Sequence, residues 1–483
     1  MGEQIEAFLN SNKSLLVAPA GYGKTTFLAN CLSTLLPIVS KRILILTHTH
    51  AGVASIKKKC SEINFKGLVE ITTISGFTQK LVSSFNGSLP APTKDGRPNF
   101  PKINEEAIII SNLKLVQIIL SNTYSHIFVD EYQDCSTKQH IILSNLAKYN
   151  PLHTLADPLQ AIFRFNNNDG ILNFDTDFSD FKIFDFLQTP WRWCQEGNNK
   201  LLGDMTKILR ASLIASENIH LDKLCGVEFI KTSSNLDDFY QNLYRIIQEL
   251  KSRSLLVLYP NGFEYSIEAR ASNKVRFDFS REFTLIEAID DKTFYVVAQL
   301  IDNFTKSSVT KTFIQALKEI LIKSSFNKGD IQKWFNDKSV KQKRQDDTVK
   351  EQSAELKSLY ETLYIDRTAY NLYRFISYLR YNLRFSPKRP ELLYSIMSIL
   401  KMHSNDTISE RMAQNRNKVR IVGRKVDGKC IGTTLLTKGL EFEDVIIIDA
   451  HKIEDKENFY VAMTRASKRL IIMSESQKWP ATH

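Results

Sequence analysis

The sequence predicts an α/β protein with two lobes, each built on a parallel β-sheet that helices cover. Short apolar runs rich in aliphatic and β-branched residues recur along the chain. Amphipathic or polar stretches of helical length separate them, an alternation that is typical of parallel sheets buried on both faces. The length of 483 residues exceeds one ordinary core, so more than one domain is expected.

The first lobe is predicted over residues 1–215. Its strands are expected at four short apolar runs, which are separated by stretches long enough for helices. A small insertion at about 82–125 contains a loop with four prolines. The predicted strands contain LLVA (Leu15–Ala18), ILILT (Ile43–Thr47), IFVD (Ile127–Asp130) and TLAD (Thr154–Asp157).

The second lobe is predicted from two separated segments, 226–284 and 416–483. A mostly helical accessory insertion is expected between them, over 285–415. Within it, the charged run Lys338–Lys357 indicates a solvated helix or loose linker, with a DNA-contacting surface as the alternative. The predicted strands of this lobe contain VEFIKT (Val227–Thr232), LLVLY (Leu255–Tyr259), VIIID (Val445–Asp449) and RLIIM (Arg469–Met473).

The composition is that of an ordinary globular protein with a basic excess. Hydrophobic residues make up 43% of the chain and charged residues 24%. The net charge of +11 favours a polyanionic partner, without choosing between nucleic acid, anionic lipid and no such partner. The six cysteines form no CxxC pair, and no apolar run approaches the ~18 residues of a membrane span. We therefore expect a cytoplasmic protein without a zinc ribbon or a membrane partner.

The stretch APAGYGKTT directly follows the first predicted strand and has the features of a phosphate-binding loop. Lys24 is expected to neutralise the β- and γ-phosphate oxygens, and Thr25 to bind Mg²⁺. The helix that follows directs its positive end toward the phosphates. Small residues let backbone N–H groups surround a phosphate chain; here they are Ala20, Gly21 and Gly23.

Two adjacent carboxylates, Asp130 and Glu131, end a predicted strand of the same lobe. Burying charge at the end of an apolar strand is costly, so a function for it is expected. Beside a phosphate loop, Asp130 is the predicted Mg²⁺ ligand. Glu131 is predicted to orient the attacking water or accept its proton.

Further motifs follow in order along the chain. They are THTHAGV (Thr47–Val53), TTISGF (Thr72–Phe77), ADPLQAIFRF (Ala156–Phe165), LQTPWRW (Leu187–Trp193), LLVLYPN (Leu255–Asn261), TTLLTKGLEFEDVII (Thr433–Ile447) and FYVAMTRASKRLII (Phe459–Ile472). Together with the phosphate loop and DEYQD, they resemble the motif set of the UvrD/Rep-like helicases of superfamily 1. The resemblance covers roughly the first 260 and the last 60 residues.

The resemblance implies two RecA-like lobes that bind ATP and Mg²⁺ between them. Gln160 is the implied γ-phosphate sensor, and Arg192 and Arg465 are the implied arginine fingers that stabilise transition-state charge. The implied nucleoside contacts are Gln4 and Trp191 at the adenine, Thr26 where the family often has a base-holding arginine, Glu441 at the ribose, and Gly439 for close backbone approach.

The same resemblance implies contacts with single-stranded or partly duplex DNA, because stacking aromatic residues and positive charge occur at the family's strand-contacting positions. For Phe163, ordinary core packing is the alternative interpretation. His48 stands where the family has a stacking phenylalanine, so DNA-contact positions depart from the family more than ATP-site positions do. The implied DNA-contacting residues are His48, Thr73, Phe163, Phe165 and Lys438.

These observations predict an ATP-dependent DNA helicase or translocase that moves 3′ to 5′ on single-stranded DNA. The alternative is a nucleotide- or DNA-sensing ATPase subunit of a nuclease complex in antiphage defence, beside a separate OLD-family nuclease as in Gabija-type systems. Its motivation is the small insertions and the altered DNA-contact positions. A phosphate-loop ATPase without a nucleic-acid role is a third interpretation.

Overall fold

The computed structural model describes most of the chain and divides it into two compact units. One unit comprises Met1–Leu89, Phe100–Ile286 and Gly423–His483, and the other comprises Pro90–Asn99 and Glu287–Val422. The described residues are 2–60, 67–93, 98–162, 172–174, 176–195, 197–233, 235–260, 283–286, 292–307, 310–324, 331–335, 339–341, 347–402, 404–422, 428–453 and 455–480.

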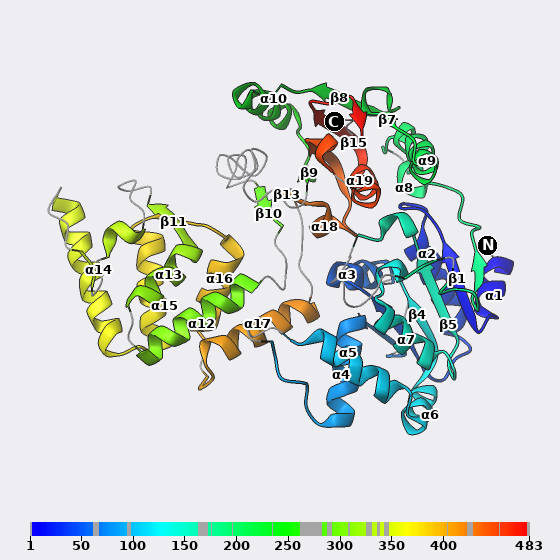
Figure 1. The fold of residues 1–483 in the computed structure, drawn as a ribbon, viewed down its shortest axis with the longest axis horizontal. Coiled ribbons are helices and arrows are strands. Elements are labelled where there is room, and N and C mark those ends of the chain that lie inside the picture. Colours follow the sequence, from blue (N-terminus) through cyan, green and yellow to red (C-terminus); the bar gives the residue numbers. More distant parts are fainter. Residues whose placement is uncertain are drawn as a thin grey trace. The chain divides into compact units, whose positions relative to one another are not determined.

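The first lobe contains a sheet in which every described strand pairs in parallel (Figure 1). All four strands predicted for this lobe are in it, whereas β3 and β6 were not predicted. Because the strands are parallel, the loop after β1 and the residues after β4 and β5 lie at one edge. The strand order is β3 (Val69–Thr73), β2 (Arg42–Thr47), β4 (Tyr124–Val129), β5 (Leu152–Ala156), β1 (Lys13–Val17) and β6 (Lys182–Phe184).

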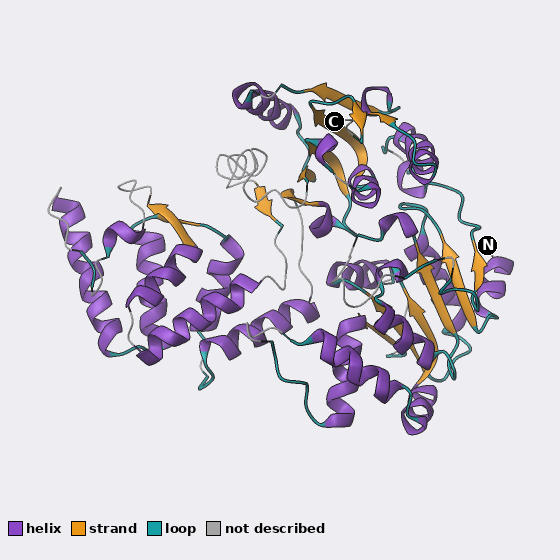
Figure 2. Cartoon of the chain, in the orientation of Figure 1, coloured by secondary structure: helices purple, strands orange, loops and turns teal. Residues whose placement is uncertain are grey.

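Helices cover both faces of this sheet, because successive strand residues point to opposite sides (Figure 2). For example, Leu15 packs in one core and Leu16 in the other. One face is covered by α1 (Gly2–Leu9), α2 (Lys24–Leu35) and α3 (His50–Lys59). The other is covered by α4 (Ile74–Asn86), α5 (Phe100–Ser111), α6 (Lys114–Thr123) and α7 (Thr137–Leu146), so the predicted small insertion packs mainly as helices.

The second lobe repeats this design with a second parallel sheet. It contains all four strands predicted for it and two further strands that were not predicted, β10 and β13. The connection from the first lobe, α8 (Trp191–Cys194) and α9 (Lys200–Ile214), packs its apolar side into the core of this second sheet. The strand order is β10 (Phe283–Leu285), β13 (Lys429–Thr433), β9 (Leu255–Tyr259), β14 (Phe442–Ile448), β15 (Ala466–Ser474) and β8 (Val227–Lys231).

Smaller elements complete the second lobe. The helices are α10 (Leu236–Glu249), α18 (Thr434–Thr437) and α19 (Lys456–Met463), with single 3₁₀ turns η3 (Leu221–Lys223) and η6 (Ala450–Lys452). A short antiparallel pair, β7 (Ile219–His220) and β16 (Lys478–Trp479), joins the start of the lobe to its end. Trp479 stacks on Phe459 with ring centroids 4.3 Å apart, which fixes the chain end against α19.

The other unit is mainly helical and has its own hydrophobic core, as predicted for the accessory insertion. The charged run Lys338–Lys357 is described only in part, and its residues from Asp347 onward begin α14. The elements are α12 (Lys292–Ser307), α13 (Thr310–Ile320), η4 (Ile331–Trp334), α14 (Asp347–Ile365), α15 (Ala369–Ser377), the π-helical turn η5 (Tyr378–Asn382), α16 (Pro390–Leu400), α17 (Ile408–Val422), and the antiparallel strands β11 (Leu321–Ser324) and β12 (Phe385–Pro387). Among the described helices of the whole chain, none has the length and apolarity to cross a membrane.

Candidate functional site

The predicted phosphate loop connects β1 to α2 and depends on two glycines with positive φ angles. Gly21 has φ 75° and Gly23 has φ 89°, a left-handed backbone that glycine adopts at little cost. A Cβ atom on Gly21 would lie 2.8 Å from Cζ3 of the buried Trp193, so the loop approaches this ring too closely for any side chain. Such loops turn their N–H groups toward a common anion.

Lys24 at the start of α2 is buried, and its ammonium lies within the loop. It donates hydrogen bonds to the backbone oxygens of Ala18, at 2.7 Å, and Pro19, at 3.1 Å. A phosphate oxygen is a stronger acceptor than a carbonyl oxygen because it carries charge. The Lys24 ammonium is therefore placed where it can exchange these hydrogen bonds for bonds to a bound phosphate.

Asp130 and Glu131 follow β4, and their surroundings shift their pKa values in opposite directions. Burial, followed by the neighbouring Glu131 carboxylate, raises the pKa of Asp130 to about 7. Burial also favours the neutral form of Glu131, but Lys438 and Lys24 outweigh it and lower the pKa of that carboxyl. Glu131 is thus the ionised member of the pair, as a proton acceptor must be.

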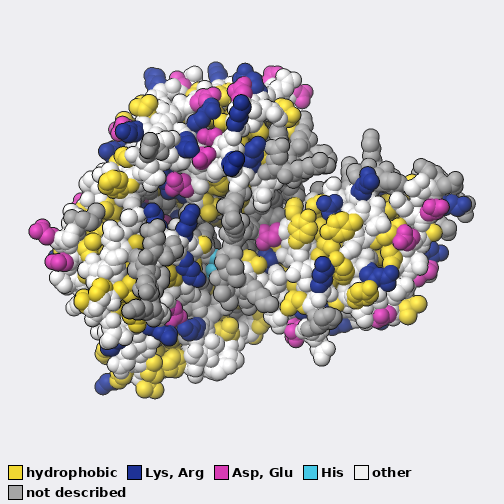
Figure 3. All heavy atoms as spheres, turned by 180° about the vertical axis from the view of Figure 1, so that it is seen from behind, with side chains coloured by type: hydrophobic (Ala, Val, Ile, Leu, Met, Phe, Trp, Pro, Cys, Tyr) yellow, Lys and Arg dark blue, Asp and Glu magenta, His cyan; other side chains and the backbone are white. Residues whose placement is uncertain are grey.

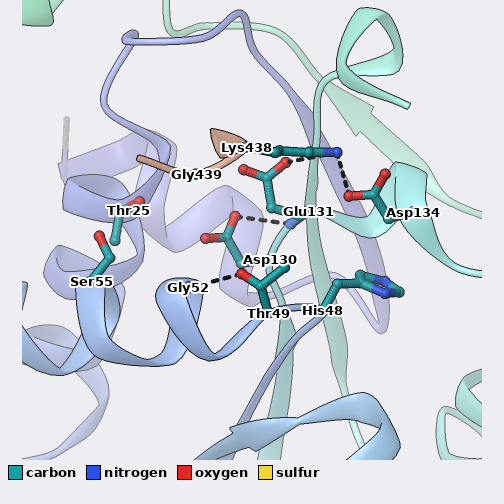
Figure 4. A pocket seen from close by; sticks show the side chains of 10 residues that line it. All are labelled: Thr25, His48, Thr49, Gly52, Ser55, Asp130, Glu131, Asp134, Lys438 and Gly439. Carbon is teal, nitrogen blue, oxygen red and sulfur yellow. Dashed lines mark hydrogen bonds and ion pairs between the residues drawn. The ribbon is translucent and has the colours of Figure 1, made fainter. Parts of the chain in front are cut away.

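The backbone at Glu131 supports this arrangement. Glu131 has φ 58°, which is uncommon outside glycine and strained. Its N–H donates to Oδ1 of Asp130 at 3.0 Å, and its side chain accepts a hydrogen bond from the Gln133 amide. The left-handed turn points the two neighbouring carboxylates in different directions, which Figure 4 shows.

The oxygen atoms present fit a magnesium ion. Thr25 and Asp130 line one pocket, together with Glu131 and residues of α3 (Figure 4). Mg²⁺ is commonly held by one or two protein oxygen ligands plus substrate phosphates. Among the described residues no group of three or more His, Cys, Asp or Glu side chains could hold a metal by itself. A hydroxyl, a carboxylate and a phosphate chain therefore form a suitable donor set for Mg²⁺.

The second lobe contributes Lys438 to this same pocket (Figure 4). Its ammonium is buried and pairs with the carboxylate of Asp134 in η1 (Tyr132–Asp134). It also donates to the backbone oxygen of Gln160 and lies 4.0 Å from Oε2 of Glu131. In this structure the lysine thus joins the loop after α18 to two predicted catalytic positions of the first lobe.

Arg465 lies at the end of α19, and its guanidinium is buried. It donates to the backbone oxygens of Val461, at 2.8 Å, and Leu440, at 3.0 Å, and to Oε1 of Gln160 at 3.3 Å. Burial lowers the pKa of Arg465 to about 10, so it remains a cation at neutral pH. Two predicted γ-phosphate residues, one from each lobe, are therefore in direct contact.

Gln160, in η2 (Pro158–Gln160), also donates from Nε2 to Oδ2 of Asp157 at 2.9 Å. Its amide therefore connects the end of β5 to Arg465. A change at either end can be transmitted through this side chain, because both of its polar atoms are in use.

Arg192 and Trp191 approach the phosphate loop from α8. The backbone N–H of Arg192 donates to the Gly21 oxygen at 3.0 Å, and its side chain pairs with Glu441 at 2.7 Å. Its Nη1 atom donates to the backbone oxygen of Thr464 at 2.6 Å. The Trp191 ring is 52% exposed, and its Cδ1 atom would lie 3.2 Å from a Cβ on Gly23. An exposed ring beside the loop is suited to stacking on a base.

Three further residues that are predicted to contact the nucleotide are exposed to solvent. Gln4 is exposed on α1, and Thr26 is exposed on the first turn of α2. Gly439 has φ 79° and open space where a Cβ would lie, and it lines the pocket beside Lys438. The roles of these residues stay predictions.

The predicted DNA-contacting residues have different surroundings. His48 is partly exposed in the pocket, with Nε2 3.4 Å from Sγ of Cys135; burial, followed by Lys438, lowers its pKa to about 3, so it is neutral at physiological pH. Thr73 is buried and caps α4 by accepting from the Gly76 N–H at 3.0 Å. Phe163 and Phe165 lie outside the described residues. These assignments, and that of Lys438, stay predictions.

A buried polar network at the phosphate loop was missed by sequence reasoning. Arg210 of α9 donates to Oδ1 of Asp157 at 2.6 Å and to the Tyr460 hydroxyl at 3.4 Å. That hydroxyl accepts from the Ala20 N–H at 3.3 Å. The sequence Ala-Asp-Pro at the end of β5 marks Asp157 as a candidate site residue. Arg210 lies in an amphipathic helix, and no motif surrounds it.

Two family models of helicase domains match parts of the chain that contain residues of this site. The family model of the UvrD/REP helicase N-terminal domain matches residues 106–179, and the model of the viral superfamily 1 RNA helicase core domain matches residues 350–474. The first match spans Asp130, Glu131 and Gln160, and the second spans Lys438 and Arg465. Both matched models are those of helicase domains, and the resemblance to superfamily 1 helicases is confirmed over these residues. The two parallel-sheet lobes and the helical accessory insertion of the predicted fold class are confirmed.

Solved structures of helicases were also found. The crystal structure of Pif1 helicase from Candida albicans is 13% identical over 98% of this chain and 93% of that chain, with a TM-score of 0.37. A structure of two coordinating Pif1 helicases at forked double-stranded DNA is 11% identical over 98% and 91% of the two chains, with a TM-score of 0.39. Both TM-scores are below 0.5, so neither likeness supports a statement about the activity of this helicase core. No curated protein matched the sequence.

Proposed function

We propose that this chain is an ATP-dependent DNA translocase of the UvrD/Rep-like type, which hydrolyses ATP between its two lobes. The supporting observation is the contact between Arg465 of the second lobe and Gln160 of the first, beside Lys438 and Glu131. A site that takes Lys438 and Arg465 from one lobe and Glu131 and Gln160 from the other is sensitive to lobe closure. Such a site can convert hydrolysis into movement along a strand.

Each group in the site has a task that its surroundings support. Lys24 and the loop N–H groups hold the phosphates, and Thr25 and Asp130 hold Mg²⁺. When bound, Mg²⁺ neutralises phosphate charge. The ionised Glu131 orients the attacking water and accepts its proton. Arg465 and Arg192 stabilise the charge that develops on the transferred phosphoryl group, and Gln160 reports its presence to Asp157.

The test is steady-state ATP hydrolysis with and without single-stranded DNA, at two salt concentrations. Strong stimulation by DNA that weakens as salt rises is expected, because phosphate contacts release counterions. Lys24→Ala should abolish turnover, whereas Lys207→Ala, at an exposed position on α9, should leave it unchanged. ATP hydrolysis that DNA does not affect would contradict the proposal and favour the regulatory-subunit alternative.

The polarity of movement needs its own measurement. Displacement of streptavidin from biotin at either end of a single strand reads the direction directly. We expect displacement from the 5′ end, which corresponds to movement 3′ to 5′. Displacement from the 3′ end alone would overturn the UvrD/Rep-like assignment of polarity while leaving the ATPase proposal intact. The nuclease partner and the role in antiphage defence stay predictions.

A further inference from the structure

The helical unit has a strongly basic, tyrosine-rich segment that the helicase chemistry does not use. Arg367–Pro390 contains six lysines and arginines, four tyrosines, and no aspartate or glutamate. It forms α15, the turn η5 and strand β12. Lys388 pairs with Glu319 of α13 at 2.9 Å. The segment itself carries a net positive charge, which attracts polyanions.

Two tyrosine rings of this segment are exposed. Tyr370 is 66% exposed and Tyr381 is 58% exposed. Tyr370, Arg374 and Ser377 follow an i, i+4, i+7 pattern, which places them on the same side of α15. Tyr381 follows in the π-helical turn η5, so a strand that reaches both rings would run along the helix.

A cation lies beside each aromatic ring. The Arg374 guanidinium is 5.8 Å from the Tyr370 ring, and that of Arg380 is 5.9 Å from the Tyr381 ring. Lys401 of α16 lies 4.8 Å from the ring of Tyr373. Pairs at these distances keep positive charge next to an aromatic face. A base stacked on such a ring would bring its phosphate close to the paired cation.

The surface continues from α15 onto α16, which packs beside it. Tyr394 of α16 is 53% exposed and shares a helical face with Lys401, seven residues later. Tyr370, Tyr373 and Lys401 line an open hollow at the start of α15. On the face of the helical unit seen in Figure 3, hydrophobic, basic and acidic side chains are intermixed.

We propose that this tyrosine–arginine face, made of Tyr370, Arg374, Arg380, Tyr381 and Lys401, binds single-stranded DNA. This inference rests on the proposed translocase function and adds a second strand-binding surface outside the helicase core. Single strands expose base faces for stacking, whereas a duplex hides them between base pairs. Protein interfaces are also enriched in tyrosine and arginine, but charged residues are depleted from their cores, and three of the five residues of this face are cations.

The test compares the full chain with the double variant Tyr370→Ala/Tyr381→Ala. Affinity for a long oligothymidine is expected to fall by about 10-fold to 100-fold, because two stacking rings are removed. Tyr370→Phe/Tyr381→Phe should bind like the natural chain, since the rings remain. Hydrolysis of ATP without DNA should not change. Tyr149→Ala, at a 49% exposed tyrosine of the first lobe, is the matched control.

The outcomes separate this inference from the proposed function. If the natural chain binds no single-stranded DNA, both fail. If it binds, and the alanine double variant binds as tightly as Tyr149→Ala, only the second surface is overturned. If the double variant loses duplex binding as strongly as single-strand binding, the face contacts duplex backbone, and the stacking proposal is overturned as well.

Discussion

Lys438 and Asp134 form a buried ion pair that joins the second lobe to the first. Neither side chain is appreciably exposed, and the same ammonium reaches the backbone oxygen of Gln160. A buried pair is expensive to break, because removing one member leaves the other charge without compensation. The pair lies beside Glu131, so the position of the second lobe and the charge state of the proposed catalytic carboxylate are coupled.

The first prediction concerns this pair. Lys438→Met and Asp134→Asn should each lower the free energy of unfolding by about 3–5 kcal/mol, and the double variant by less than the sum, because neither member of the pair is then left without the other. Denaturant titration of all three variants measures the coupling. The exposed pair Lys468–Glu443, at 2.7 Å, is the control and should contribute about 0–1 kcal/mol. Additive losses at Lys438 and Asp134 would refute the coupling.

The second prediction concerns Arg465. Arg465→Ala should lower ATP turnover by about 1000-fold, because the cation that stabilises the transition state is lost. Arg465→Lys should recover little of it, since an ammonium cannot keep the separate bonds to Val461, Leu440 and Gln160.

Arg469→Ala, at an exposed arginine of the same segment, should turn over normally. Binding of a fluorescent ATP analogue should remain in every variant, and circular dichroism checks the fold. Normal turnover in Arg465→Ala would remove this residue from the proposed mechanism.

The third prediction concerns Gly21. Gly21→Ala should weaken ATP binding strongly, because the new Cβ meets Trp193 at 2.8 Å and the backbone is left-handed. Gly87→Ala is the matched control, since Gly87 also has φ 75° but nothing within 4 Å. Backbone strain destabilises both variants by about 1 kcal/mol, so the melting temperature should fall in both. Only Gly21→Ala should lose affinity for the nucleotide; equal affinity in the two would show that the contact with Trp193 is irrelevant.

The fourth prediction is a pH dependence of stability that arises from buried His153. Burial, followed by His126, lowers the pKa of His153 to about 3, and its Nδ1 lies 2.8 Å from the Ser14 hydroxyl. In the unfolded chain histidine titrates near pH 6.5, so acidification protonates the unfolded state first. Stability should therefore fall as pH drops below about 6.5, by about 2 kcal/mol between pH 7.5 and 5 from this group.

The double variant Ser14→Ala/His153→Phe removes both partners, so no buried polar atom loses its bond. Its free energy of unfolding should depend less steeply on pH over the same range. Denaturant titrations at several pH values measure this slope. An unchanged slope would exclude His153 as the source.

Much of the candidate site could be predicted because its signals are local. Asp130 and Glu131 directly follow an apolar run, and Lys24 ends a loop of small residues that follows another. The strands β3, β6, β10 and β13 were missed because their hydrophobic patterns are weak. They are short or only partly buried, and β13 contains a glycine among its five residues. Arg210 was missed because nothing in the sequence of its helix indicates that this arginine contacts Asp157, which is distant along the chain.

The sequence by itself determined the two-lobe α/β fold, the helical insertion and the nucleotide-binding elements, because strand periodicity and loop chemistry act over a few residues. Only the tertiary structure decided which distant groups meet: Lys438 with Asp134, Arg465 with Gln160, Arg210 with Asp157, and Trp193 with Gly21. The physical reason is that these contacts depend on how parallel strands and their helices pack. Packing is set by the whole core, and burial then fixes the charge of each group that it brings together.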